Sequence, residues 1–268
     1  MKVDVVSLKG EIKGSKVLPP QFSELVRPDL IKRAVQAIQS HKRQAYGADP
    51  RAGVKYSADL PRRRRKYKTP YGRGVSRVPR KTLSSRGTQF YWVGAFAPGT
   101  VGGRRAHPPK AEKVVWKKIN KKERKKAIRS ALAATFVKDL VLKRGHRVPD
   151  SFPFILSDDA EKIGKTKEFS SVLLSLGFKD ELKRSSVKKI RPGKGTMRGR
   201  PYKKAKGILL VVGNECPALK SFKNIPGADV VEVSELNAEL LAPGCHPGRL
   251  TLFTESAIDK LNKEGLFL

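Results

Sequence analysis

The apolar residues that follow Pro28 recur with the period of an α-helix. They stand at i, i+3, i+4 and i+7, which gives one apolar face that can dock on a core: Ile31, Ala34, Val35 and Ile38. Proline is well placed in a first helical turn, and Gly47 is the next residue with a strong tendency to end a helix. The pattern therefore predicts an amphipathic helix that starts at Pro28 and stops before Gly47.

A second helical pattern begins at Asn120. Asparagine is a favoured N-cap residue, and Glu123, three residues later, completes the pattern of a capping box. Four residues at helical spacing form the stripe expected to be buried: Ile128, Ala131, Leu132 and Thr135. We expect this helix to continue to Gly145.

The rest of the chain alternates between predicted strands and predicted helices. Ile208–Val212 is a continuous, β-branched-rich apolar run, which is typical of a strand covered on both faces. The other predicted strands are Val3–Leu8, Phe154–Leu156, Asp229–Val233 and Leu250–Phe253, and the other predicted helices are Lys167–Leu176, Ser234–Leu241 and Glu255–Leu261. This alternation predicts an α/β fold with a mainly parallel sheet flanked by helices.

Two segments interrupt the pattern. Residues 46–112 show no lasting period of 3.6 or 2 and are rich in glycine and proline, so we expect a long extended internal loop. Residues 188–206 form a second, basic loop. The predicted globular domain consists of residues 1–45 and 113–268. A loop with no core of its own is most simply ordered by a bound partner.

Charge identifies the class of that partner. The chain carries a formal net charge of +34, and no Asp or Glu occurs from Leu60 to Ala111. From Gly207 to Leu268, by contrast, acidic residues outnumber basic ones. A charge of this size favours a polyanionic ligand, and nucleic acid is the first candidate. We find no apolar run that could span a bilayer and no signal-peptide pattern at Met1–Gly10, so we expect no membrane partner.

Aromatic residues within the basic segment favour RNA over duplex DNA. Arginine pairs with phosphate and stacks on bases, and aromatic rings stack on the unpaired bases that folded RNA offers. We identify eighteen basic residues as candidate RNA contacts: Arg62, Arg63, Arg64, Arg65, Arg73, Arg77, Arg80, Arg86, Arg104, Arg105, Lys121, Lys122, Lys125, Arg191, Lys194, Arg198, Arg200 and Lys203.

No motif indicates catalysis. Gly164-Lys165-Thr166 is similar to the end of a P-loop, but Asp159 stands where that loop needs its first glycine. Cys216 and Cys245 are not in a CxxC, so neither a disulfide framework nor a zinc site is indicated. We expect no catalytic residue, no metal site and no cofactor. A nucleic-acid-processing α/β enzyme and a DNA-packaging protein remain the alternatives to a structural RNA-binding protein.

Four segments resemble one known family. They are Tyr71–Arg80, Gly102–Pro109, Arg129–Thr135 and Arg191–Lys204, and together they resemble the universal large-subunit ribosomal protein four family in its archaeal/eukaryotic form. The chain lacks the long basic C-terminal extension of eukaryotic members, which favours the archaeal type. The resemblance implies a structural protein, not an enzyme, that is ribosome-bound in the cytoplasm.

The resemblance also implies partners and a place in the ribosome. The internal loop is expected to enter the large-subunit rRNA, support assembly and line the peptide exit tunnel. There it would meet large-subunit protein twenty-two and, transiently, the nascent peptide; no homo-oligomer is expected. The loop tip carried over by position is Lys66, Tyr67, Lys68, Thr69, Pro70, Tyr71, Gly72 and Arg73. Phe90, Tyr91 and Trp92 match no feature of the family, and their role stays open.

Overall fold

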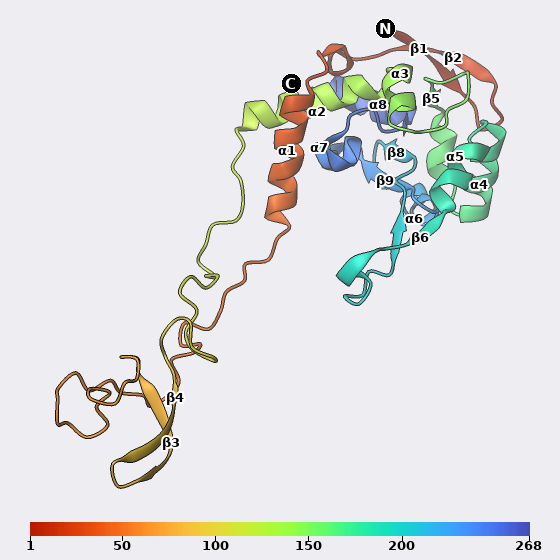
Figure 1. Cartoon of the computed structure of the whole chain (residues 1–268). Helices are drawn as coiled ribbons and strands as arrows, with labels where there is room; N and C mark the ends of the chain where they lie inside the picture. The colour runs from red at the N-terminus through yellow and green to blue at the C-terminus, as the bar shows by residue number, and fades with distance from the viewer. The chain divides into compact units, whose positions relative to one another are not determined.

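The computed structural model describes all residues from Met1 to Leu268 and divides the chain into two compact units. Unit 1 consists of Met1–Lys42 and Trp116–Leu268, and unit 2 is the intervening segment Arg43–Val115. Figure 1 shows the strands and helices of both units in chain order.

Unit 1 contains two three-stranded sheets. In the first, β1 (Lys2–Val6) pairs antiparallel with β2 (Ile12–Val17) and parallel with β5 (Ile155–Leu156). In the second, β8 (Leu209–Val212) is central and pairs parallel with both β9 (Asp229–Glu232) and β10 (Thr251–Phe253). A single parallel bridge from Leu156 to Thr254 links the two sheets. The α/β class is confirmed, but in place of one mainly parallel sheet there are one parallel sheet and one mixed sheet.

Unit 1 also contains all eight α-helices of the chain. Their bounds are α1 Pro28–His41, α2 Lys121–Thr135, α3 Lys138–Lys143, α4 Thr166–Ser175, α5 Lys179–Ser186, α6 Ala218–Lys223, α7 Ala238–Leu241 and α8 Glu255–Lys263. Five short 3₁₀ turns occur as well: η1 Pro20–Ser23, η2 Asp158–Lys162, η3 Gly193–Gly195, η4 Val233–Glu235 and η5 Pro243–Cys245. None of the helices is both long and apolar enough to cross a lipid bilayer.

The predicted bounds of α1 are confirmed, because the helix starts at Pro28 and ends at His41, before Gly47. Other predicted helix boundaries were wrong. The helix expected from Asn120 to Gly145 is two helices, because the chain leaves the helical conformation at Val137 between α2 and α3. The Asn120 side chain makes no capping hydrogen bond, and Glu123 forms a salt bridge with Arg33 instead of closing a capping box. The helix expected at Ser234–Leu241 is likewise divided, into η4 and α7.

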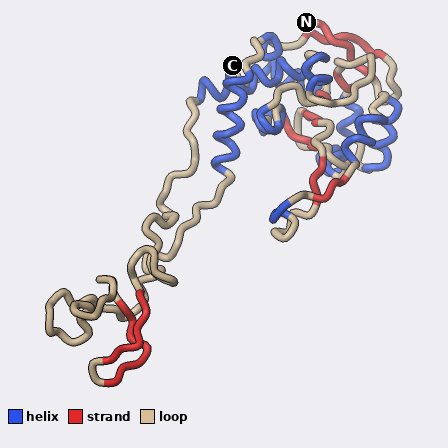
Figure 2. The backbone as a smooth tube through the Cα atoms, in the orientation of Figure 1, coloured by secondary structure: helices blue, strands red, loops and turns tan.

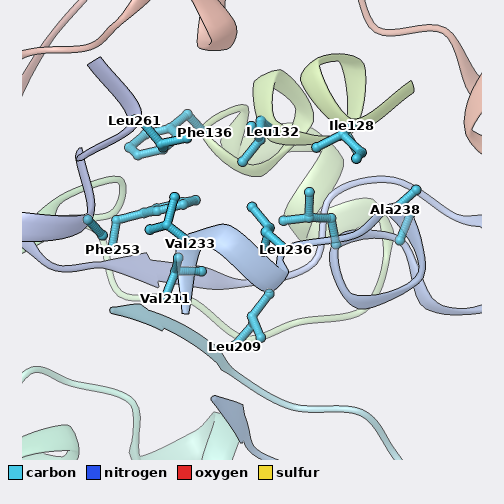
Figure 3. Close-up of a cluster of buried hydrophobic side chains, with 14 of the residues drawn as sticks. Ile128, Leu132, Phe136, Leu209, Val211, Val233, Leu236, Ala238, Phe253 and Leu261 are labelled. Atoms are coloured by element: carbon cyan, nitrogen blue, oxygen red, sulfur yellow. The ribbon is translucent and has the colours of Figure 1, made fainter. Parts of the chain in front are cut away.

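The core of unit 1 lies on both faces of β8. Leu209 and Val211 join a cluster that contains the buried stripes of α1 and α2, whereas Leu210 and Val212 join a second cluster with α4 and α6. Figure 3 shows side chains of the first cluster, in which Ile128 and Leu132 of α2 lie on the side toward Val233 and Leu236. The prediction of a strand covered on both faces is confirmed.

Unit 2 buries very little of itself. Its buried residues are Pro61, Thr69, Pro70 and Ala95, and Thr69 is the only polar one among them. Figure 2 shows it as loops and turns around one hairpin, formed by β3 (Arg80–Arg86) and β4 (Gln89–Gly94). Regular structure was not expected in this segment, so the hairpin corrects the sequence-based prediction.

A second hairpin corrects the prediction for residues 188–206. Strands β6 (Lys188–Ile190) and β7 (Tyr202–Lys204) pair antiparallel there, with η3 in the connection between them. The segment was expected to be a basic loop. The sequence does not indicate these strands, because each is only three residues long. All their side chains are exposed, so the sequence shows no alternation of apolar and polar residues there.

Candidate nucleic-acid interface

The turn at residues 63–73 places basic side chains at the surface of unit 2. Thr69 closes it, because its hydroxyl donates to the Arg63 carbonyl at 2.9 Å and its amide donates to the Lys66 carbonyl at 3.1 Å. Arg65 and Lys68 both adopt a left-handed backbone, with φ of 60°. All four arginines from Arg62 to Arg65 are exposed, as are Lys66 and Tyr67. Of the predicted tip residues, only Thr69 and Pro70 are buried.

Strand β4 supplies two aromatic rings on one face of the hairpin. Phe90 and Trp92 are two residues apart, so their side chains leave the strand on the same side. Their rings are stacked, with centroids 5.1 Å apart and planes 23° from parallel. Tyr67 adds its ring edge-on to Phe90 at 5.2 Å. These rings form a small platform in a unit that has few buried side chains.

Two arginine side chains lie over this platform. The Arg73 guanidinium is 5.0 Å from the Phe90 ring centre and 5.7 Å from that of Trp92, and the Arg80 guanidinium is 5.4 Å from Trp92. Arg73 donates to the Thr88 carbonyl at 2.8 Å, and Arg80 donates to the Ser76 hydroxyl at 2.7 Å. Both cations are thus held by rings and neutral oxygens, and no carboxylate pairs with either.

The platform gives Phe90 and Trp92 a role that the sequence left open. They lie against the guanidinium groups of Arg73 and Arg80, and neither of these cations forms a salt bridge. Tyr91 leaves the strand on the opposite side and is 76% exposed. An exposed, unpacked ring of this kind is able to stack on a base.

The other predicted contacts of unit 2 are also exposed. The Arg77 guanidinium lies 6.0 Å from the Tyr71 ring centre, and these residues line a surface depression of about 290 Å³ with Leu60 and Arg62. None of the remaining three forms a salt bridge: Arg86, Arg104 and Arg105. The structure therefore gathers Arg73 and Arg80 on one platform and Arg62 and Arg77 at one depression, and leaves the others separate.

In unit 1, the first turns of α2 expose three predicted contacts, namely Lys121, Lys122 and Lys125. Lys125 donates to the carbonyl of Leu268 at 2.7 Å. Arg129, one turn further along, is committed internally, because it pairs with Glu24 at 2.9 Å and donates to the Phe267 carbonyl. Lys121 and Lys122, at the start of α2, are therefore exposed cations without a hydrogen-bond or salt-bridge partner in the chain.

The β6–β7 hairpin carries the remaining predicted contacts. Arg191 has a structural role, because its guanidinium donates across the hairpin to the carbonyls of Arg200 and Tyr202. Four others project from the hairpin and its connection and are exposed: Lys194, Arg198, Arg200 and Lys203.

A cationic cleft of about 510 Å³ lies between this hairpin and α5. Lys203 is the only predicted contact that lines it. The other basic side chains in its lining were missed by the sequence analysis: Arg147, Lys183, Arg184, Lys189 and Lys204. They come from three separate stretches of chain, and α5 was not predicted, so only the fold brings them together. No carboxylate lines the cleft.

A buried carboxylate accepts hydrogen bonds from two residues that line this cleft, Arg147 and Arg184. Glu181 on α5 accepts hydrogen bonds from Arg184 at 2.6 and 2.8 Å, from the His146 ring at 2.7 Å and from the Arg147 amide at 3.0 Å. Burial alone would raise the pKa of Glu181, but the hydrogen bonds from Arg184, His146 and Arg147 outweigh it and lower that pKa to about 2. Burial also lowers the pKa of His146, more than the neighbouring Glu181 raises it.

Comparison with known proteins identifies the family. The model described as "Ribosomal protein L4/L1 family" matches residues 16–264. A protein of Nanoarchaeum equitans named large ribosomal subunit protein uL4 is 50% identical over 268 residues, which is 100% of both chains. Proteins of the same name from Archaeoglobus fulgidus and Methanosphaera stadtmanae are each 46% identical, covering 98% and 97% of this chain and 99% and 96% of their own.

These matches confirm the resemblance found in the sequence, and the named relatives are archaeal, as expected. They also confirm that the chain is not an enzyme, because the family consists of structural proteins. With a family model that extends over most of its length and relatives of up to 50% identity over the whole of it, the chain belongs to the ribosomal protein L4/L1 family.

Proposed function

We propose that the chain is a structural constituent of the large ribosomal subunit that binds large-subunit rRNA and supports subunit assembly. The observation that carries this proposal is the platform of unit 2, where Phe90 and Trp92 hold Arg73 and Arg80 without a neutralising carboxylate. The names and full-length coverage of the relatives support the same assignment. A ribosome-bound place in the cytoplasm follows from it.

The mechanism rests on neutralisation of rRNA phosphates. Each Lys or Arg that contacts a phosphate releases condensed counterions, and this release favours the approach of neighbouring RNA segments. Unit 2 has few buried side chains to hold it, so contacts with rRNA would offset the entropy lost on its ordering. Unit 1, with its two core clusters, would provide the rigid anchor.

Salt-dependent binding tests this mechanism. Replacement of Arg62–Arg65 by glutamine should weaken binding to large-subunit rRNA and lower the slope of log affinity against log salt by roughly one for each phosphate that is no longer bound. The matched control replaces four exposed lysines of unit 1 that form no salt bridge: Lys9, Lys32, Lys220 and Lys223. Equal effects of the two sets of substitutions on rRNA binding would contradict the proposal. Equal salt slopes for rRNA and duplex DNA would also contradict it and would favour a DNA-packaging protein.

The tip at Lys66–Arg73 is proposed to line the peptide exit tunnel, beside large-subunit protein twenty-two and within reach of the nascent peptide. The family resemblance supports this placement, and so does the exposure of Lys66 and Tyr67 on a closed turn. Cryo-electron microscopy of the source organism's large subunit would test it. We expect density for the turn in the tunnel wall; density for the turn elsewhere in the subunit would rule the placement out.

A further inference from the structure

Unit 1 has an open pocket of about 660 Å³, and none of the contacts predicted from the sequence lines it. The end of α3, the turn at residues 245–247 and Pro28 of α1 contribute to its lining. Four cationic side chains line it, and no Asp or Glu does: Lys143, Arg144, Arg184 and Lys206.

The cations of this pocket differ in how they are neutralised. Arg184 pairs with Glu181 at 2.6 Å, and Lys206 pairs with Asp229 at 2.9 Å. Arg144 and Lys143 form no salt bridge. The Arg144 guanidinium donates only to the backbone carbonyls of Pro243, at 2.6 Å, and of His246.

Arg144 is also half-buried among like charges. Burial and the nearby guanidinium groups of Arg249 and Arg184 lower the pKa of Arg144 to about 10. A half-buried cation without a counter-ion is unfavourable, and an anion in the pocket would relieve the repulsion. A guanidinium has five N–H donors, of which the two carbonyls occupy a part, so donors remain for a planar, two-point contact with an oxyanion.

We infer that this pocket binds a phosphate group supplied by an RNA strand, with Arg144 and Lys143 as the binding residues. The inference rests on the proposed function. Continuity with the cationic cleft favours an RNA strand over free phosphate, because Arg184 lines both the pocket and the cleft. The cleft adds further unneutralised lysines along the same surface, namely Lys183, Lys189, Lys203 and Lys204. A strand that follows the cleft would thus place its next phosphates at the pocket.

Binding of large-subunit rRNA by the full chain tests the inference. Lys143 is exposed and its side chain forms no hydrogen bond or salt bridge within the chain, so Lys143→Gln should leave the fold intact, weaken binding about threefold and lower the salt slope by roughly one. Arg144→Gln should weaken binding about tenfold, because it removes a charge-assisted hydrogen bond to the phosphate. Lys138→Gln removes a charge from the same helix outside the pocket and should change neither quantity. Equal effects of Lys143→Gln and Lys138→Gln would overturn the inference.

A second arm identifies the source of the phosphate. Inorganic phosphate should raise the melting temperature of the wild-type chain above its value in chloride at equal ionic strength, and Lys143→Gln should reduce that rise. If inorganic phosphate protects the wild type while Lys143→Gln leaves rRNA binding unchanged, the pocket takes free phosphate and the RNA assignment is overturned. If the wild type itself shows no preference for large-subunit rRNA, the proposed function fails; an unchanged Lys143→Gln beside a selective wild type overturns this inference alone.

Discussion

Glu181 is a fully buried carboxylate, and its partners come from two separate stretches of chain. Arg184 lies on the same helix, whereas His146 and the Arg147 amide follow α3. Arg249 is buried in a similar way, with hydrogen bonds to the Gly207 and Leu240 carbonyls and a salt bridge to Asp229 at 2.5 Å. A buried ion pair adds little net stability, but removal of one partner leaves an uncompensated charge.

The first prediction concerns this uncompensated charge. Glu181→Gln should lower the free energy of unfolding by about 3 kcal/mol, because it removes the negative charge that faces Arg184 and replaces one of the two acceptor oxygens by an N–H donor inside unit 1. Urea denaturation at neutral pH measures the change. Glu168→Gln is the control, because Glu168 is exposed and its salt bridge with Lys165 is at the surface. If Glu181→Gln lowered the free energy of unfolding as little as Glu168→Gln does, Glu181 and Arg184 would not form a buried ion pair.

The second prediction concerns pH. The folded-state pKa of His146 lies below its ordinary 6.5, so the unfolded chain takes up this proton first as the pH falls. Stability is therefore lost as the pH falls below 6.5. The carboxylate of Glu181, with its pKa lowered from 4.5 to about 2, adds a further loss between those two values.

Urea unfolding between pH 7 and pH 5 isolates the histidine contribution. The wild type should lose stability over this interval, and His146→Gln should lose less. His246→Gln, at an exposed histidine, is the control for the substitution itself. A pH profile that is the same for His146→Gln and the wild type would contradict the assignment.

At the scale of single residues, the sequence predicts exposed chemistry better than buried chemistry. The exposure of Arg62–Arg65 follows from four consecutive cations without a nearby acid. Asp229 and Arg249, by contrast, stand in the sequence only as two charges of the mixed region Gly207–Leu268, yet the fold buries Arg249 against β9 and α7. Their positions are twenty residues apart in a stretch of mixed charge, so only tertiary structure reveals the pair.

Among elements, the β3–β4 hairpin departs most from the expectation. Five of the six residues in Gln89–Gly94 are apolar, aromatic or glycine, so no polar–apolar alternation signals a strand there. The exposure of the side chains alternates along β4 instead. Phe90 and Trp92 are half-buried, whereas Gln89, Tyr91 and Val93 are exposed. Strand β8 could be predicted because a core on both faces requires apolar residues at every position.

The third prediction belongs to this hairpin. Trp92→Ala should weaken rRNA binding by about 1 kcal/mol, because Arg73 and Arg80 lose the ring that fixes them. The salt slope should change little, since both charges remain. Trp92→Phe should retain most of the affinity, and Val93→Ala, on the opposite face, serves as the matched control. Filter binding over a salt series measures both quantities; an equal loss for Val93→Ala would contradict the role of the platform.

The short helices show a further limit of sequence patterns. Helix α5 has the sequence KDELKRSS, in which Leu182 is the only large apolar residue, so no amphipathic period can be read. Its buried face consists of Glu181 and Ser185, whose burial depends on partners elsewhere in the chain. The cationic cleft beside α5 was unforeseen for the same reason.

At the scale of the whole molecule, the two units obtain their stability in different ways. Unit 1 has core clusters on both faces of its central strand, whereas unit 2 has the ring platform and very few buried side chains. The acid-free run Leu60–Ala111 lies entirely within unit 2. A segment with high charge and little buried apolar surface depends on a partner for its order.

The fourth prediction follows from this difference. Limited proteolysis of the free chain with trypsin should cut first within Pro61–Arg105 and leave the fragments of unit 1 associated. Large-subunit rRNA should protect the same sites. Mass spectrometry of the early fragments identifies the cuts. Early cleavage inside α2 or α8, or a protease-resistant unit 2 without RNA, would contradict the prediction.

The central claim is that the chain is a structural part of the large ribosomal subunit held by rRNA contacts. Sucrose-gradient sedimentation of a cell lysate after a high-salt wash tests it most directly. The chain should sediment with the large subunit after the wash and be released only when the rRNA is digested. A chain that stays at the top of the gradient, or that sediments with DNA instead, would contradict it.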